Sequence, residues 1–144
     1  ASYAQESTRY CNYSKSKFGS QLTFIQPSWC SVDWTEYSPE ELDDILRDEP
    51  VVPDHIWLKA MKAAETYYFQ LLEAGRSPEE ARAVLPNSLK TEIVMTTNLR
   101  EWRHFFRMRT SAASHPQMRE IAVPLLKAFK DMIPVVFDDI DPGE

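Results

Sequence analysis

The sequence predicts a single domain of the α+β class, mostly helical with a few strands. The motif Ser-Pro-Glu-Glu occurs at residues 38–41 and again at 77–80, and this order of a capping serine, proline and glutamate is typical of a helix start. Apolar residues recur every three or four positions between residues 54 and 75, as on one face of a long helix. Residues 89–97 are rich in β-branched side chains, which favours a strand. With 144 residues, of which 43% are hydrophobic and only 3 are glycine, the chain has the composition of a globular domain.

The first third of the chain predicts one strand and one short helix. Residues 1–35 alternate over short distances and show no helical period, and residues 22–25 predict a strand that ends before Pro27. The helix that begins at the first Ser-Pro-Glu-Glu should be short, because Pro50 and Pro53 end it.

A long helix should follow, capped by Asp54 and ended by Gly75, which is a natural left-handed terminator. The second Ser-Pro-Glu-Glu then begins a shorter helix that continues through Leu85 to Pro86. The apolar face expected on the long helix consists of Trp57, Met61, Ala64, Tyr68 and Leu71.

Two more helices are expected after the strand at 89–97. Asn98 is the predicted cap of a helix that runs to about Arg109. The last helix should begin near residues 114–116, and Pro124 should kink it. Its expected apolar face consists of Met118, Ile121, Ala122, Leu125, Phe129 and Met132.

Charge and cysteine content narrow the class of protein. The net charge of −6 argues against generic nucleic-acid binding, which needs a surplus of Lys and Arg. Acid gathers at residues 36–54 and in the tail, whereas base gathers at 100–109. Cys11 and Cys30 are too few for a disulfide framework; one bridge is possible, but we expect two reduced thiols. No stretch approaches the roughly 20 apolar residues of a membrane span and no signal peptide is recognisable, so we expect a soluble, cytoplasmic protein without a membrane partner.

The segment at 98–110 predicts a helix with a basic stripe. Leu99, Trp102, Phe105 and Phe106 turn one way, while the stripe consists of Arg100, Arg103, His104 and Arg107. Two interpretations stay open: a solvated charged face, or an anion site, for which the planar arginine fork is well suited. Arg109 lies beyond the stripe, toward the aromatic side, where a buried charge would need a partner.

A second set of polar residues lies near the beginning of the sequence, in AQESTRY at residues 4–10. Ser7, Thr8 and Arg9 could bind a phosphate, and the amide of Gln5 could read a base or a flavin edge. The alternative is a plain polar extension. Arg82 sits in an otherwise apolar short helix, where a lone arginine is usually snorkelling or paired.

Self-contained catalytic motifs are absent from the sequence. His55, His104 and His115 are too widely spaced for a metal site, and we expect no metal. There is no Walker loop, no dinucleotide glycine fingerprint and no G-x-S-x-G. Cys11 and Cys30 could act as nucleophiles only if the fold brought a base to them.

Three segments, in this order, resemble the flavin-dependent thymidylate synthases. The family signature is Arg-His-Arg, seven arbitrary residues and then Ser, overlapping a run S-[FY]-N-E-x-S-x-R-Y. ASYAQESTRY at residues 1–10 matches that run, with Ser7 as the signature serine. EARAVLPNSLKTEIVMTTNLREWRHFFRMR at 80–109 resembles a second family block, and HPQMREIA at 115–122 resembles the helix after it.

The resemblance implies the thymidylate synthase-complementing protein fold and the reductive methylation of dUMP to dTMP. Methylenetetrahydrofolate supplies the methylene group, reduced FAD the hydride, and NADPH regenerates the flavin. Such enzymes use no cysteine nucleophile and are homotetramers. Residues 1–144 would be a single domain and the C-terminal portion of a larger one, because the Arg-His-Arg would end two positions upstream of Ala1.

Residue roles can be carried over by position from this family. The dUMP site would consist of Gln5, Glu6, Ser7, Thr8, Arg9, Arg82 and Arg109. Arg109 would also be catalytic, favouring the anionic form of the pyrimidine ring. The FAD contacts would be Gln5, Asn98, Leu99, Arg100 and His104.

Two departures from the family pattern affect the expected activity. Ala4-Gln5 replaces the family's Asn-Glu, and the Arg-His-Arg does not occur in this sequence. We therefore expect this chain alone to bind FAD poorly and to be inactive unless a second polypeptide supplies the N-terminal portion. Two alternatives remain: an inactive relative that serves as an oligomerisation or regulatory subunit and, less favoured by the acidic composition, a nucleic-acid-binding helical module.

Overall fold

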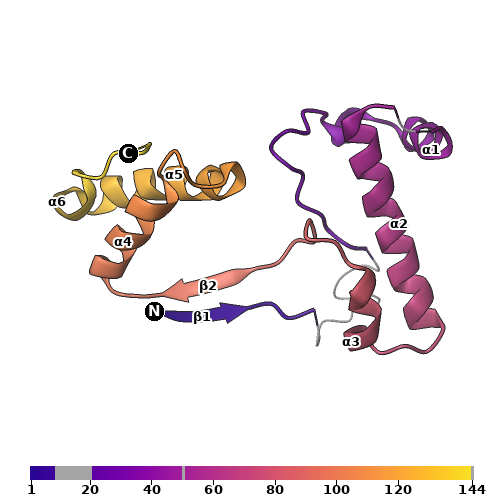
Figure 1. The fold of residues 1–144 in the computed structure, drawn as a ribbon, viewed down its shortest axis with the longest axis horizontal. Coiled ribbons are helices and arrows are strands. Elements are labelled where there is room, and N and C mark those ends of the chain that lie inside the picture. Colours follow the sequence, from indigo (N-terminus) through magenta and orange to yellow (C-terminus); the bar gives the residue numbers. More distant parts are fainter. Residues whose placement is uncertain (9–20, 50, 144) are drawn as a thin grey trace. The chain divides into compact units, whose positions relative to one another are not determined.

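The computed structural model of the chain describes residues 1–8, 21–49 and 51–143 (Figure 1). These residues form two compact units. The N-terminal unit is Gln5–Glu92, and the C-terminal unit is Ile93–Glu144 together with Ala1–Ala4. The α+β class is confirmed, because six helices and a two-stranded sheet make up the regular structure of the described residues. The assignment of the whole chain to a single domain stays a prediction.

The N-terminal unit is helical, and both predicted Ser-Pro-Glu-Glu starts are confirmed. Helix α1 is Pro39–Arg47 and helix α3 is Pro78–Ala81. In each, the serine side chain accepts a hydrogen bond from the third helical N–H, and the glutamate there accepts from the serine N–H. This reciprocal capping satisfies two backbone donors that a helix start would otherwise leave unpaired. The second helix is shorter than expected, since a 3-10 turn at Arg82–Val84 replaces its last part.

Helix α2 is Pro53–Glu73, and its predicted apolar face is confirmed. Met61 and Tyr68 are buried, while the other members of the face are half-buried. Gly75 follows the helix with φ of +85°, a conformation that glycine adopts without steric cost. The core of the unit is Leu22, Tyr68 and Ala81, with six partly buried apolar side chains packed around them: Phe24, Phe69, Leu71, Leu72, Leu85 and Leu89.

Asp54 was predicted to cap α2, and this prediction is wrong. The N-cap is Val52, which makes no side-chain capping bond. The Asp54 carboxylate instead accepts hydrogen bonds from the backbone N–H groups of Ser31 and Val32 at 3.2 and 3.3 Å. Proline at the first helical position places the N-cap two residues earlier than predicted, at Val52, so the Asp54 carboxylate can stabilise a distant loop.

The predicted strand at residues 22–25 is also absent from the described structure. Phe24 forms an isolated antiparallel bridge with Leu89 and no longer ladder. That register sets Pro27 opposite Pro86, and proline has no N–H with which to extend a ladder. On the other side the Leu22 N–H donates to the Glu65 carboxylate at 2.9 Å.

The C-terminal unit combines a small sheet with three helices. Strand β2 is Ile93–Thr96, shorter than the predicted 89–97, and it pairs with β1 at Ser2–Gln5, running in the opposite direction (Figure 1). The sequence did not predict β1. Helix α4 is Leu99–Arg109, and the predicted cap is confirmed, because the Asn98 side chain accepts from the Glu101 N–H at 2.9 Å.

Helix α5 is Pro116–Met132 and α6 is Pro134–Phe137, a short helix that the sequence did not predict. Helix α5 is continuous through Pro124, and its predicted kink stays a prediction. Its N-cap is His115, whose ring nitrogen accepts from the Gln117 N–H at 3.3 Å. The fold therefore ends in a helical hairpin that packs around α4.

The predicted apolar face of α5 is partly wrong. Ile121 and Met132 are 66% and 65% exposed, whereas Ala122 and Leu126 are buried. Leu126 joins a core cluster with Phe106, Phe137 and Ile140. The α6 segment and Ile140 cover the side of α5 that carries Leu126, so the buried face is rotated from the one that spacing alone favours. None of the helices in the described part of the chain is long and apolar enough to cross a bilayer.

Candidate functional site

The N-terminal unit contains a cavity of about 440 Å³. It is lined by Gln5, Glu6, Ser7, Thr8, Arg82, Leu85, Pro86, Leu89 and Thr91. Residues 5–8 and Arg82, which were predicted as nucleotide ligands, therefore meet at one cavity. Residues 85, 86 and 89 supply an apolar wall that the sequence did not assign to the site.

Backbone and hydroxyl contacts hold the segment at residues 5–8 beside residues 91 and 92. The Glu6 N–H donates to the Glu92 carbonyl at 2.9 Å, and the Thr91 hydroxyl donates to the Glu6 carbonyl at 3.3 Å. Leu89, two residues before Thr91 in the sequence, packs against the core of the unit. The hydroxyls of Ser7 and Thr8 are thus carried by a segment with defined backbone partners.

Arg82 reaches the same cavity, although it lies near the opposite end of the unit's sequence from residues 5–8. It follows α3 directly and is the first residue of the 3-10 turn, so the Ser77 capping box fixes the backbone just before it. Its guanidinium donates to the Thr8 hydroxyl at 3.4 Å, which joins residues 74 positions apart. A guanidinium has five N–H donors, so one long bond to Thr8 leaves donors for a bound anion.

The chemistry of this cavity suits a phosphorylated, partly flat ligand. The Arg82 guanidinium can form paired hydrogen bonds to phosphate oxygens. The hydroxyls of Ser7 and Thr8 add donors, and the Gln5 amide both donates and accepts. The apolar wall offers a surface for a ring. Arg9 lies outside the described residues.

The other predicted site residues lie on α4 or at its cap. Asn98 caps the helix, and Leu99, Arg100 and His104 are exposed along it. Arg109 is the last residue of α4 and is also exposed. The idea that Arg109 needs a partner on a buried apolar side is therefore wrong, because the helix ends before a following turn could cover it.

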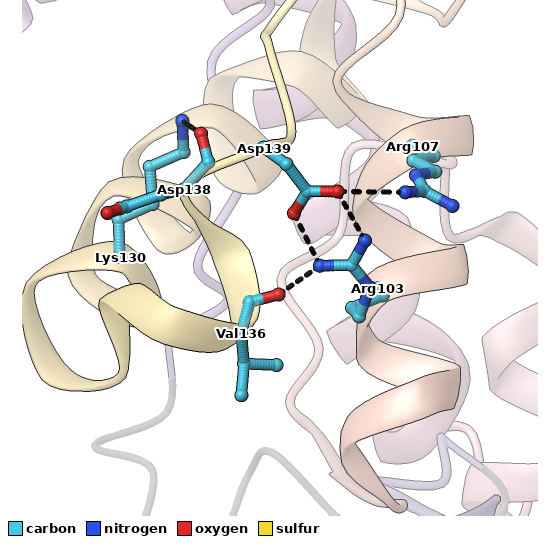
Figure 2. Close-up of polar contacts among 6 residues, drawn as sticks. All are labelled: Arg103, Arg107, Lys130, Val136, Asp138 and Asp139. Atoms are coloured by element: carbon cyan, nitrogen blue, oxygen red, sulfur yellow. Dashed lines mark hydrogen bonds and ion pairs between the residues drawn. The ribbon is translucent and has the colours of Figure 1, made fainter.

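The predicted basic stripe is only partly free for a ligand. Arg103 donates from Nη1 and Nη2 to Oδ1 and Oδ2 of Asp139, both at 2.6 Å (Figure 2). Arg103 also donates to the Val136 carbonyl, and Arg107 donates to Asp139 Oδ2 at 3.2 Å. Two of the four stripe residues are thus bound to a carboxylate of the same unit. Arg100 and His104 stay exposed.

The Arg103–Asp139 pairing shifts the pKa values of both side chains. Hydrogen bonding from Arg103, aided by its charge, holds the pKa of the Asp139 carboxyl well below its ordinary value. The same bonds raise the pKa of Arg103. Asp139 is therefore a permanent anion at neutral pH. The sequence signal for it was the acidic tail, which sequence reasoning noted without naming a partner.

Cys30 shows no features of a nucleophile. It is a free, buried thiol with 6% exposure, and burial raises its pKa. A protonated thiol is a poor nucleophile. Cys11 lies outside the described residues. Within the described ranges, no three His, Cys, Asp or Glu side chains are grouped so that they could hold a metal ion.

Comparisons with known proteins agree with the motifs. The family model described as thymidylate synthase complementing protein matches residues 1–135. A flavin-dependent thymidylate synthase of Geobacter sulfurreducens is 32% identical over 143 residues, which cover 99% of this chain and 53% of that protein. One of Corynebacterium aurimucosum is 44% identical over 69 residues, which cover 48% of this chain and 28% of that protein.

The fold also matches solved structures. The crystal structure of thymidylate synthase X from Helicobacter pylori with FAD and dUMP superposes with a TM-score of 0.62 and 18% identity, covering 96% of this chain and 61% of that chain. At this identity the match shows a shared fold. The chain spans about half the length of the Geobacter relative.

Proposed function

Because this chain belongs to the thymidylate synthase complementing protein family, we propose that it takes part in flavin-dependent thymidylate synthesis. The reaction is the reductive methylation of dUMP to dTMP, with FAD as cofactor and with NADPH and methylenetetrahydrofolate as co-substrates. The active protein is a cytoplasmic homotetramer. The related proteins of Geobacter and Corynebacterium are named flavin-dependent thymidylate synthases.

The observation that carries this proposal is the cavity of the N-terminal unit. Ser7, Thr8 and Arg82 line it together, and the guanidinium bond to Thr8 brings the first motif block to the second. Each block resembles the family by its sequence alone, so the resemblance did not depend on how close the two blocks lie in the structure. A site with a cation, two hydroxyls and an apolar wall has the chemistry that a nucleoside monophosphate requires.

The nucleotide ligands in this proposal are Gln5, Glu6, Ser7, Thr8, Arg9, Arg82 and Arg109. Arg82 binds the phosphate. Arg109 is the catalytic residue, since a fixed cation beside the pyrimidine ring stabilises the negative charge that develops there. Its exposure on α4 leaves it accessible to a ligand.

The FAD contacts are Gln5, Asn98, Leu99, Arg100 and His104. The exposed cation of Arg100 suits the cofactor's diphosphate, and the 45% exposed side chain of Leu99 suits a ring. When bound, FAD supplies the hydride of the reaction. The residues of this chain bind and orient it.

The proposed self-assembly is supported by apolar side chains that the C-terminal unit leaves exposed. Ile121 and Met132 of α5 are separated by three helical turns and share a face, and Val135 just beyond is 93% exposed. A contiguous exposed apolar patch is typical of an interaction site, and assembly through this face would cover these side chains.

Titration of the purified chain with dUMP tests the nucleotide site. The expected result is a rise of the melting temperature, because a ligand that binds only the folded state stabilises it. In Arg82→Ala, loss of a charge-assisted bond of about 1.5–3 kcal/mol should weaken dUMP binding roughly 10- to 150-fold. Deoxyuridine, which lacks the phosphate, should bind both proteins equally.

The matched control is Arg47→Ala, which removes an arginine of the same unit that lies outside the cavity and pairs with Asp44 at 3.3 Å. It should leave dUMP binding unchanged. Equal losses in Arg47→Ala and Arg82→Ala, or no response of the unsubstituted chain to dUMP, would contradict the proposed nucleotide site.

A further inference from the structure

Asp139 is the partner of two arginines on α4, one turn apart. It accepts two parallel bonds from Arg103 at 2.6 Å and one from Arg107 at 3.2 Å (Figure 2). Arg103 extends the contact to the Val136 carbonyl in the same segment. All four residues belong to the C-terminal unit.

The segment that carries Asp139 is itself fixed. Phe137 is fully buried and Ile140 is 2% exposed, and both belong to the core cluster with Phe106. Moving the backbone of this segment away from α4 would require these apolar side chains to leave the core. The segment therefore acts as a rigid support from which the Asp139 side chain, 57% exposed, pairs with the arginines of α4.

The aromatic packing and the Arg103–Asp139 ion pair constrain α4 differently. Apolar contacts between Trp102, Phe106 and Phe129 hold α4 close to α5 but depend weakly on direction. A bidentate arginine–carboxylate pair is geometrically demanding. The Arg103–Asp139 pair can therefore set the rotation of α4 about its own axis, which the aromatic cluster alone leaves less defined.

Small rotations matter for groups at the end of long side chains. Helix side chains extend to about 5–6 Å from the axis, so a rotation of roughly 20° displaces such a group by about 2 Å. Binding sites tolerate a displacement of their ligand-binding groups of only about 0.5 Å. Arg100 and His104 lie on the same stripe of α4 as Arg103, three positions before it and one after it.

We propose that Asp139 and Arg103 are positioning residues for the flavin contacts of α4, because their pairing sets the rotation at which α4 presents Arg100 and His104. This inference rests on the proposed function for its ligand. Removing the Asp139 charge also raises the positive potential along α4, and that effect alone would strengthen binding of the anionic FAD. The loss of positioning and the gain in positive potential therefore change FAD affinity in opposite directions.

The experiment compares Asp139→Asn, Asp139→Glu and the control Asp141→Asn in the full chain. Asn keeps the shape without the charge, Glu restores the carboxylate, and Asp141 lies in the same tail, 4.0 Å from Lys130. FAD affinity is measured by flavin fluorescence, dUMP affinity by titration, and the orientation of α4 relative to α5 by residual dipolar couplings of the backbone amides.

Asp139→Asn should weaken FAD binding about tenfold, alter the visible circular dichroism of bound flavin, and rotate α4 relative to α5 by more than about 10°. Its dUMP affinity should fall as well, because the proposed dUMP ligand Arg109 ends the same helix. Asp139→Glu should recover most of both losses, and Asp141→Asn should behave as the unsubstituted chain. Unchanged or tighter FAD binding in Asp139→Asn overturns the inference. If the unsubstituted chain alone binds too little FAD to titrate, as the sequence leads us to expect, the orientation of α4 decides: an unchanged orientation in Asp139→Asn refutes the positioning role. Loss of the dUMP response of the unsubstituted chain would instead contradict the proposed function.

Discussion

Phe106 is the side chain on which the packing of α4 depends most. It is fully buried, and its ring centroid lies 5.1 Å from that of Phe129, 5.6 Å from Trp102 and 5.8 Å from Phe137. The Trp102 ring is stacked on it, whereas the other two meet it edge to face. Phe106→Ala would leave an empty volume bordered by these three rings and by Phe105, whose ring centroid lies 5.5 Å from that of Phe106.

The expected cost follows from this enclosure. Phe→Ala substitutions in cores destabilise by about 3–5 kcal/mol, and the cost is highest where the neighbours cannot move into the space. We expect about 4 kcal/mol here, since the ring contacts are lost as well. A typical domain has a stability of about 5–15 kcal/mol, and for a chain of this size the loss corresponds to roughly 8–16 °C in melting temperature.

Urea unfolding followed by near-UV circular dichroism measures this loss. Met108→Ala is the matched control, because Met108 is 48% exposed on the same helix and its truncation should cost less than about 1 kcal/mol. A loss below about 2 kcal/mol in Phe106→Ala, or equal losses in both variants, would show that the aromatic cluster is not the core of this unit.

Three further substitutions test separate features. Arg109→Ala should remove most of the dUMP-induced rise in melting temperature while leaving unliganded stability within about 0.5 kcal/mol, because Arg109 is exposed; an unfolded variant would indicate a structural role. In a Cys11→Ser background, Cys30 should react with a thiol reagent at pH 8 at least about 100-fold more slowly in the folded chain than in guanidinium, since it is buried and its pKa is raised; similar rates would contradict its burial. Because Arg103 holds the pKa of Asp139 below its ordinary 3.8, ionised Asp139 stabilises the folded chain above that pH, and the contribution is lost as pH falls through the lower folded-state pKa. The destabilisation by Asp139→Asn, measured by urea unfolding, should therefore shrink below pH 3.8, and an equal loss at pH 7 and pH 2.5 would refute this assignment.

Local signals in the sequence were sufficient for most helix starts and ends. The capping serines, Asn98 and Gly75 act on backbone groups within about four residues of themselves, so their effect does not depend on the rest of the chain. Where the fold offered a better partner, the local rule failed. Asp54 has the chemistry of a cap, but it bonds to two backbone amides more than twenty residues away.

The candidate nucleotide site was predicted residue by residue from its resemblance to a family, but its walls were not. Leu85 and Leu89 resemble any core leucine in the sequence, and only the chain path brings them to the cavity with Ser7. The roles of Ser7 and Arg82 as ligands stay predictions. Their proximity depends on backbone pairing between segments far apart in the chain.

The sequence by itself determined the fold class, the capped helix starts and the family, because each depends on residue types at fixed short spacings. The tertiary structure decided which face of α5 is buried and which cations of α4 are occupied. Ile121 and Leu126 are equally apolar, and only the position of the α6 segment selects between them. Likewise Arg100 and Arg103 have the same side chain, but Asp139 lies within reach of Arg103. Contacts between distant residues depend on the path of the whole chain, and no local pattern specifies that path.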